Sequence, residues 1–257
     1  MNIALFAAGN VGYEVARVFG DNNVEPLCLV LDSKASSEMK GKIIEAAKVP
    51  EDRVYYSDEL YSKEILNTLE KMRPDLIILC WWPYIIKEPL ISLPRHGCLN
   101  FHPSLLPNNR GKHYNFWALV EEAPFGVTLH FVDEGVDTGD IAFQSRIETT
   151  WEDTGETLYY KAQQEIVRLF KDNFSRIVNG DIPRTPQNHE EGSFHRASEL
   201  DPASEIVLDS HCRARNLLNM IRARTFPPHP AAWFVENGSR YEVRIEIKKI
   251  DSGGSDG

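Results

Sequence analysis

Apolar runs of strand length alternate with amphipathic segments along the first hundred residues, and this alternation restricts the possible folds more than any other feature. The apolar runs occupy residues 2–8, 25–32, 75–82 and 97–102. The run at 75–82 (DLIILCWW) is almost uninterrupted, as expected of a strand covered on both faces of its sheet. Helices between such strands favour parallel pairing. The sequence therefore predicts an α/β fold with a Rossmann-like, doubly wound, mainly parallel sheet.

The second half of the chain continues this pattern and then changes in character. Residues 126–133 and 140–148 predict two strands around the loop EGVDTG, and residues 154–179 predict a long helix that opens with a capping motif. A short helix is also expected near residues 88–93. Beyond residue 180, polar turns surround one expected helix (211–222) and a hairpin with an Asn-Gly turn. The predicted regions are a catalytic domain (1–180), a small α+β subdomain (181–250) and a disordered tail (251–257).

Composition and charge narrow the range of functions. The 257 residues carry a formal net charge of −10, which weighs against general binding to nucleic acid. The negative net charge is still compatible with a small anionic substrate, because a binding site needs only a few local cations. No apolar run has the roughly 18–20 residues of a membrane span, and we expect no secretory leader. The four cysteines lack CxxC spacing, so we expect a cytoplasmic protein with reduced thiols and no membrane partner.

The segment CLNFHPSLLPNNRGKH (98–113) places an amide and an imidazole two residues apart. On an extended strand, Asn100 and His102 therefore face the same side. An amide donor and a group that exchanges protons near neutral pH suit a carbonyl oxygen that gains charge during acyl transfer. Asp137, in the loop EGVDTG, would orient the imidazole. Taken singly, Asn100 is better explained as a strand-end cap and Asp137 as a turn residue.

The first glycine turn offers a competing interpretation. AAGNVG resembles the dinucleotide-binding fingerprint with Ala7 in place of its first glycine, and Asp32 ends the second strand, where a carboxylate holds a ribose diol. A nicotinamide-dependent oxidoreductase is therefore an alternative, although Gly9 and Gly12 suit any tight strand-to-helix turn. We expect no metal site, because the eight histidines form neither HExxH nor Cys/His pairs. His130 is expected to be a packed strand residue.

Taken together, these motifs resemble the formyltransferases that use 10-formyltetrahydrofolate. The resemblance covers most of residues 70–180, and its matching residues are Asn100, His102, Pro103 to Pro107, Arg110, Gly111 and the run GVTLHFVDEGVDTGDI. It implies that Asn100, His102 and Asp137 form the catalytic set. It also implies that 10-formyltetrahydrofolate is the formyl donor.

The same resemblance implies where the donor binds. In this family the pterin lies in a slot between the end of a central strand and the loop that carries the catalytic aspartate. The implied cofactor-binding residues are Trp82, Pro83, Tyr84, Ile85, Leu106 and Gly135. Strand alternation predicts that one of Trp81 and Trp82 belongs to the core, but not both.

The C-terminal region resembles that of sugar N-formyltransferases, through SFHRASELD and RNLLNMIRARTFPPHPAAWF. Those enzymes formylate the amino group of a nucleotide-linked (UDP or dTDP) amino-dideoxy sugar for surface polysaccharide, and we expect a homodimer. The alternative acceptors are glycinamide ribonucleotide and methionyl-tRNA. For Arg222 and Arg224, a solvated helix face explains the sequence equally well. The expected substrate-binding residues are Asn10, Arg110, Gly111, Lys112, Phe194, Arg222, Arg224 and Phe226.

Overall fold

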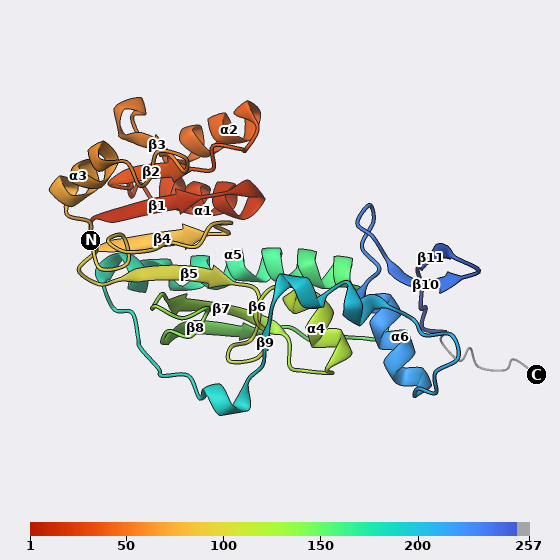
Figure 1. Cartoon of the computed structure of the whole chain (residues 1–257). Helices are drawn as coiled ribbons and strands as arrows, with labels where there is room; N and C mark the ends of the chain where they lie inside the picture. The colour runs from red at the N-terminus through yellow and green to blue at the C-terminus, as the bar shows by residue number, and fades with distance from the viewer. Residues whose placement is uncertain (251–257) are drawn as a thin grey trace, which may run out of the picture.

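A seven-stranded sheet lies at the centre of the molecule, in the strand order β3-β2-β1-β4-β5-β7-β8 (Figure 1). The computed structural model describes residues 1–250, so the predicted tail lies outside the described residues. Five strands are parallel, and β7 and β8 pair antiparallel to close one edge. The strands are β1 (Ile3–Ala7), β2 (Cys28–Leu31), β3 (Val54–Tyr56), β4 (Leu76–Cys80), β5 (Cys98–His102), β7 (Gly126–Phe131) and β8 (Ile141–Arg146). The predicted fold class is confirmed.

Helices cover both faces of the sheet. They are α1 (Gly9–Asp21), α2 (Ser37–Ala47), α3 (Lys63–Met72), α4 (Tyr114–Val120), α5 (Gly155–Asn179) and α6 (Ala214–Ala223). Alternate residues of β4 point into two separate cores: Ile78 packs with α1, α2 and α5, whereas Ile77 packs with α3. Both faces of the strand are therefore dry, which explains its uninterrupted apolar run. None of the helices in residues 1–250 combines the length and the hydrophobicity that crossing a bilayer requires.

The long helix begins where its capping motif predicts. The Thr154 side chain accepts a hydrogen bond from Thr157 N, and the Thr157 hydroxyl accepts one from Thr154 N. By contrast, the short helix expected near residues 88–93 is a series of turns. The Ser92 hydroxyl donates to the Pro89 carbonyl at 3.2 Å, an acceptor that a continuing helix would use, and Pro94 disfavours the helical conformation at Leu93.

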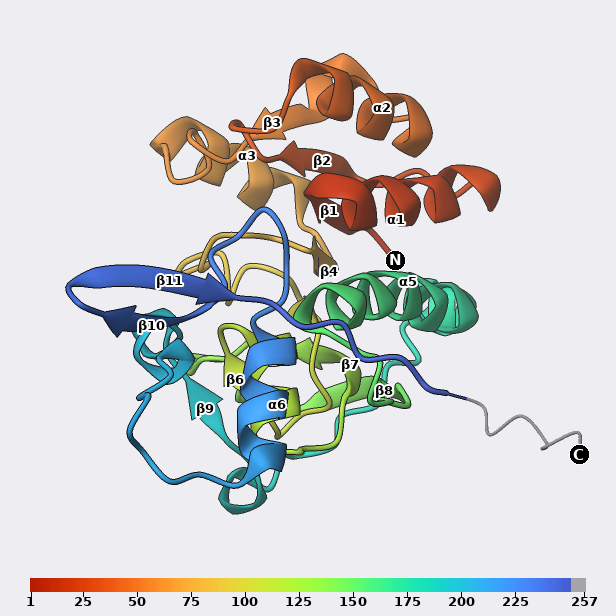
Figure 2. The same cartoon turned by 90° about the vertical axis from the view of Figure 1, so that its right-hand side faces the viewer.

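The C-terminal part forms a separate small unit. Strands β10 (Ala232–Glu236) and β11 (Ser239–Val243) make a hairpin with no hydrogen bonds to the central sheet. Its turn residues Asn237 and Gly238 both have positive φ angles, 49° and 75°, as a tight hairpin turn requires. Figure 1 shows this hairpin and α6 beyond the end of the sheet toward which the β5 arrow points, and Figure 2, seen from that side, shows α6 in front of the sheet. A further short pairing, between β6 (Arg110–Gly111) and β9 (Phe194–His195), joins the two parts.

Candidate active site

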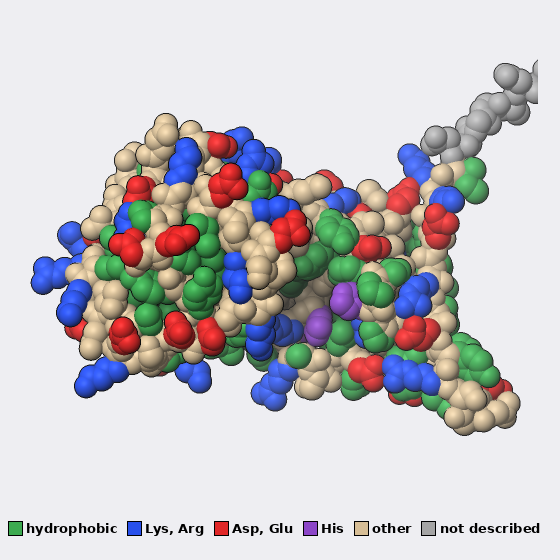
Figure 3. Space-filling model, turned by 90° about the horizontal axis from the view of Figure 1, so that it is seen from above, with side chains coloured by type: hydrophobic (Ala, Val, Ile, Leu, Met, Phe, Trp, Pro, Cys, Tyr) green, Lys and Arg blue, Asp and Glu red, His purple; other side chains and the backbone are tan. Residues whose placement is uncertain are grey.

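The predicted catalytic residues lie together at the carboxyl ends of the strands. Asn100 and His102 are on β5, and Asp137 is on the loop between β7 and β8. In Figure 3 the surface is hollowed between the sheet and the C-terminal unit, with histidine side chains (purple) beside the hollow. The carboxyl ends of parallel strands are the usual position of a site in such sheets.

The imidazole of His102 lies between two acceptors. Its Nδ1 is 3.4 Å from Asp137 Oδ2, and its Nε2 is 3.3 Å from the carbonyl oxygen of Asn109. Burial lowers the pKa of His102, although the charge of Asp137 opposes this effect. The ring is therefore neutral at neutral pH and has one proton for two acceptors. If it gains a second proton, both nitrogens can donate, so the ring is placed to accept a proton during a reaction.

Asp137 has one backbone donor and two imidazoles beside its carboxylate. Gly111 N donates to Oδ2 at 2.9 Å, and Oδ1 lies 3.4 Å from His130 Nε2. Burial alone would raise the pKa of Asp137, but His102 and His130 in their protonated forms, together with the Gly111 N–H, outweigh it and hold the pKa well below its usual range. The backbone of Asp137 has φ 55°, a left-handed conformation that turns its side chain toward these partners.

His130 belongs to this group, which the sequence did not show. Its side chain is buried, as expected of a packed strand residue, yet it also contacts Asn100 and Asp137. Its Nδ1 lies 2.8 Å from the Phe131 carbonyl and must donate there, which leaves Nε2 to accept from Asn100 Nδ2 at 3.1 Å. The signal that identifies His130 is the pairing of β5 with β7, where Asn100 and His130 are direct neighbours.

The segment after β4 carries most of the residues expected to bind the cofactor. Trp82 is partly buried, with its ring edge-on to Phe6 (5.3 Å) and Tyr84 (5.6 Å), and its Nε1 is buried without a hydrogen-bond partner among residues 1–250. Pro83 and Ile85 are exposed. The Tyr84 hydroxyl donates to Asp32 at 2.7 Å.

The expectation that only one of Trp81 and Trp82 belongs to the core is wrong. Trp81 packs against the core on the α5 side, and Trp82 packs against the core on the α3 side. Both residues follow the end of β4, where Trp81 has a left-handed backbone (φ 54°), and both faces of the sheet are covered, so both rings find apolar partners.

Leu106 and Gly135, also expected to bind the cofactor, shape the loops around the site. Leu106 is buried, and its backbone is tied to Thr128 and Gln144 by hydrogen bonds. Gly135 N donates to Asp133 Oδ1 at 3.0 Å. A Cβ on Gly135 would lie 2.0 Å from the Thr138 hydroxyl, so a larger residue would displace that side chain from its hydrogen bond to Asp133.

The residues expected near the diphosphate surround the catalytic group on the β6 side. The Gly111 N–H donates its hydrogen bond to Asp137, as described above. Arg110 Nη1 lies 3.3 Å from His189 Nδ1. The Lys112 side chain is exposed, and its charge contributes to lowering the pKa of His102. Phe194 is exposed and lies against Gly111.

The remaining expected substrate residues are dispersed. Arg222 is 8% exposed, and its Nη1 lies within 3.3 Å of the Thr150, Trp151 and Asp153 carbonyl oxygens. Its donors are engaged with the protein itself, which argues against the expected ligand contact. Arg224 is partly exposed at the end of α6, and its Nε donates to Ser204 Oγ at 3.0 Å.

Phe226 and Asn10 lie on different elements, one packed against α5 and the other in α1. Phe226 packs on Tyr159 (5.3 Å) and Tyr160 (6.3 Å) at the start of α5. Asn10 is exposed in the first turn of α1, at the carboxyl end of β1. Both residues lie at the edge of the sheet where the catalytic group is found.

A doubly wound sheet that presents an amide, a neutral imidazole and a carboxylate at its carboxyl edge defines a protein equipped for acyl transfer. The chain belongs to the formyltransferase family, as its motifs predict. Residues 10–172 match the family described as formyl transferase, and residues 199–249 match the N-formyltransferase dimerization C-terminal domain.

Curated relatives carry the name methionyl-tRNA formyltransferase. The protein of Agathobacter rectalis is 32% identical over 237 residues, which are 90% of this chain and 74% of the relative. That of Alkaliphilus oremlandii is 30% identical over 191 residues, 74% of this chain and 60% of the relative. The chain thus spans less than two thirds of the Alkaliphilus protein.

Solved structures resemble the chain over nearly its whole length. A sugar N-formyltransferase from Shewanella sp. superposes with a TM-score of 0.80 at 19% identity and covers 97% of this chain and 99% of its own. A 4-N formyltransferase from Francisella tularensis has a TM-score of 0.80 at 23% identity, with 96% and 98% covered. These likenesses establish a shared fold that includes the C-terminal unit.

Proposed function

We propose that this protein transfers a formyl group from 10-formyltetrahydrofolate to the amino group of a nucleotide-linked (UDP or dTDP) amino-dideoxy sugar. The match of residues 199–249 to the N-formyltransferase dimerization C-terminal domain supports this proposal. The formyltransferase PseJ from Anoxybacillus kamchatkensis, 25% identical with a TM-score of 0.58, was solved with UDP-4,6-dideoxy-4-formamido-L-AltNAc and tetrahydrofolate. It covers 78% of this chain, and its ligands are of the proposed classes.

The catalytic group suits this reaction. The neutral amine attacks the formyl carbon, a new C–N bond forms, and the carbonyl oxygen becomes negative. Asn100 Nδ2 has two N–H groups, and among residues 1–250 it hydrogen-bonds only to His130, so one N–H is available to this oxygen. His102 takes up the proton that the amine loses, and the Asp137 carboxylate beside it stabilises the charged ring. The carbonyl then re-forms and the bond to the folate nitrogen breaks as His102 returns the proton to that nitrogen.

The residues around the proposed donor site fit a flat heterocycle. Ile85, on the segment after β4, is 76% exposed, and Val136, on the Asp137 loop, is 46% exposed. A bound pterin would cover such apolar side chains, which favours binding. The unpartnered Nε1 of Trp82 lies in the same segment as Ile85 and adds an unused donor.

The acceptor would bring negative charge to a protein that is acidic overall. Arg110, Lys112 and Arg224 supply the local cations for its diphosphate, and Phe194 and Phe226 supply aromatic surface for its base. We further propose a homodimer formed through the C-terminal unit, and a cytoplasmic enzyme of surface polysaccharide synthesis. The free, buried thiols of Cys28, Cys80 and Cys98 suit a reducing compartment.

Methionyl-tRNA is the second candidate acceptor, because the curated relatives carry that name. The net charge of −10 opposes it, since tRNA binding draws on Lys and Arg contacts to phosphates. The oxidoreductase alternative is weaker. Asp32, which would hold the ribose diol, accepts a hydrogen bond from Tyr84 instead, and the family match supports formyl transfer.

The test is an acceptor panel. Purified protein is incubated with 10-formyltetrahydrofolate and a set of UDP- and dTDP-linked amino sugars, with glycinamide ribonucleotide and methionyl-tRNA as competing acceptors. Mass spectrometry of the products should show one added formyl group on an amino sugar. Formylation of methionyl-tRNA with no formylated sugar would overturn the proposal, as would reduction of a nicotinamide cofactor.

A further inference from the structure

The linker between α5 and the C-terminal unit, residues 180–196, touches both loops that carry the catalytic machinery. Figure 1 shows it leaving α5, running below β7 and β8, and rising to β9. Neither family match includes residues 173–198, which contain the whole of this linker. Many of its side chains, among them those of Asn188 and Glu190, are exposed. Its contacts with the protein are therefore concentrated at a few points.

The first point is the loop of Asp137. Thr185 pairs with Ile141 through two backbone hydrogen bonds of 2.8 and 2.9 Å. The side-chain nitrogen of Gln187 donates to the Asp137 carbonyl at 2.9 Å and to the Gly139 carbonyl at 2.6 Å. Asp137 has a left-handed backbone, which a non-glycine residue keeps only where its surroundings hold it. One amide of the linker therefore supports the backbone of Asp137 and the residue two positions beyond it.

The second point is the carbonyl that meets His102. Ser193 Oγ accepts a hydrogen bond from Asn109 N at 3.0 Å and lies 3.2 Å from Asn109 Oδ1. Arg110 N donates to the Ser193 carbonyl at 3.0 Å. Asn109 is 1% exposed, and its carbonyl is the acceptor beside His102 Nε2. Ser193 thus fixes one of the two acceptors between which the imidazole lies.

The third point is Gly111, whose N–H binds Asp137. Gly111 pairs with His195, and Lys112 N donates to the His195 carbonyl at 3.0 Å. A Cβ on Gly111 would lie 2.3 Å from that carbonyl oxygen, so the linker lies directly against the glycine. The pairing keeps the Gly111 N–H directed at the carboxylate.

The linker is secured to the domain by the side chain of His195. This ring stacks on Trp117 at 3.8 Å with an angle of 8° between the planes. Its Nε2 lies 2.8 Å from Glu121 Oε1, and its Nδ1 lies 3.1 Å from Glu199 Oε2. Helix α4 is therefore clamped to the linker at the position where β9 meets β6.

We propose that the linker is a strap that positions the catalytic groups: Gln187 and Ser193 are positioning residues for Asp137 and His102, and His195 is their anchor. The strap holds both sides of the Asp137–His102 pair at once. A tether that only joined two units would need none of these contacts. The catalytic consequence rests on the proposed formyl transfer, whereas the effect on His102 does not.

The test compares Gln187→Ala and Ser193→Ala with Glu190→Ala, an exposed residue of the same linker. We expect kcat to fall about 10- to 100-fold in the first two variants, the scale for small misplacement of reacting groups. KM for both substrates should stay close to wild type, and Glu190→Ala should match wild type throughout. Ser193→Thr, which keeps the hydroxyl, should retain most of the activity.

Nuclear magnetic resonance of the His102 ring and the Gly111 amide gives a readout that needs no substrate. At a temperature where all variants are folded, the midpoint of His102 titration and the Gly111 amide shift should move in Gln187→Ala and Ser193→Ala only. Unchanged kcat and unchanged spectra would overturn the strap, and so would equal changes in Glu190→Ala. If no amino sugar is formylated, the proposed function fails while the spectra still decide this inference.

Discussion

Asn100 and His130 face each other across β5 and β7, and their nitrogens Nδ2 and Nε2 are 3.1 Å apart. Two nitrogens at this distance form a hydrogen bond only if one is an acceptor, and the Phe131 carbonyl makes His130 Nε2 that acceptor. The contact fixes which end of the Asn100 amide carries its donors. His130 therefore aligns the amide that the proposed mechanism uses to stabilise the oxyanion.

Replacing Asn100 by alanine should remove this donor without unfolding the protein, because Asn100 supplies one side-chain hydrogen bond at a half-buried position. We expect kcat to fall about 100- to 1,000-fold, the scale for loss of one oxyanion donor. Steady-state kinetics and a melting curve give the two readouts. Turnover near wild type would contradict the role, and a variant that fails to fold would favour a structural cap.

His130→Phe should keep the ring but lose the acceptor, so the Asn100 amide can rotate. We expect a smaller loss of kcat, about tenfold, for a donor that is present but misaligned. In a double-mutant cycle, His130→Phe should have a smaller effect in an Asn100→Ala background, and the effect that is left reports the contact of His130 with Asp137. Losses that simply multiply would show that His130 acts independently.

The protonation of His102 should make the free energy of unfolding depend on pH. Burial lowers its pKa below 6.5, so the unfolded chain binds this proton more readily than the folded protein. The contribution of His102 is therefore complete above about pH 6.5 and is lost as the pH falls toward the folded-state pKa. Urea unfolding between pH 5 and 7.5 should show a smaller slope of stability with pH in His102→Asn than in wild type. Equal slopes would contradict this reading.

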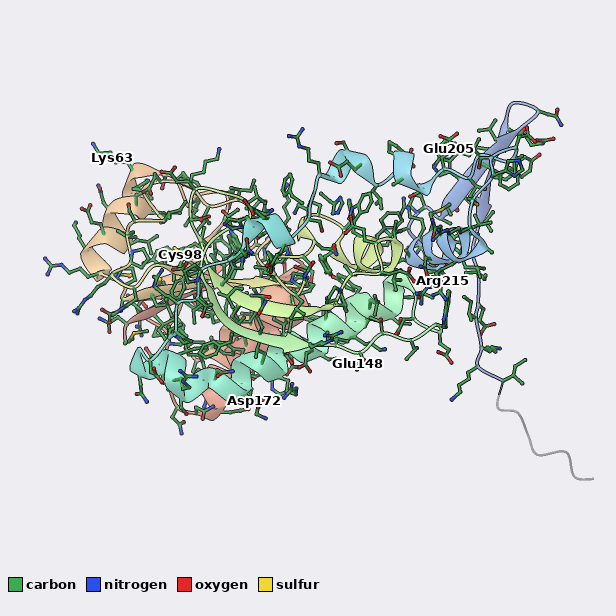
Figure 4. The ribbon with its side chains drawn as sticks, turned by 90° about the horizontal axis from the view of Figure 1, so that it is seen from below. Lys63, Cys98, Glu148, Asp172, Glu205 and Arg215 are labelled. Carbon is green, nitrogen blue, oxygen red and sulfur yellow. The ribbon has the colours of Figure 1, made fainter. Side chains whose placement is uncertain are left out.

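Arg222 should matter for stability because its guanidinium is buried against carbonyl oxygens. Arg222→Ala leaves those carbonyls without a partner, and we expect a loss of about 2–4 kcal/mol in the free energy of unfolding. The matched control is Arg215→Ala on the same helix (Figure 4), whose ion pair with Glu122 is exposed and contributes below about 1 kcal/mol. Chemical denaturation measures both. Equal losses would refute the buried role.

The sequence pattern alone predicted the features that depend on residues close together in the chain. The alternation of apolar runs predicted the sheet, and the period of two predicted that Asn100 and His102 share a face. The helix expected near residues 88–93 failed because the Ser92 hydroxyl occupies the Pro89 carbonyl and Pro94 disfavours a helical backbone at Leu93, which an apolar pattern does not register.

The missed roles depend on contacts between distant segments. His130 joins the site through strand register, which places it opposite a residue 30 positions earlier. The Arg222 guanidinium donates hydrogen bonds to carbonyl oxygens 69 to 72 positions earlier in the sequence. The linker residues Gln187 and Ser193 bind loops 48 and 84 positions away. No periodicity in the sequence encodes such pairings, so only the folded structure distinguishes a positioning side chain from an exposed polar one.

Arg224 should separate the two ligands of the proposed reaction. Its Nε is bonded to Ser204, and within residues 1–250 its two terminal nitrogens have no hydrogen-bond partner, so they are free to meet a phosphate. Loss of one charge-assisted contact costs on the order of 1.5–3 kcal/mol, which raises the Kd of the sugar nucleotide about tenfold to a hundredfold. Calorimetry with each ligand should show this weakening in Arg224→Ala, unchanged folate binding, and neither effect in Arg215→Ala. If Arg224→Ala weakened folate and left the sugar nucleotide unaffected, the C-terminal unit would not hold the acceptor.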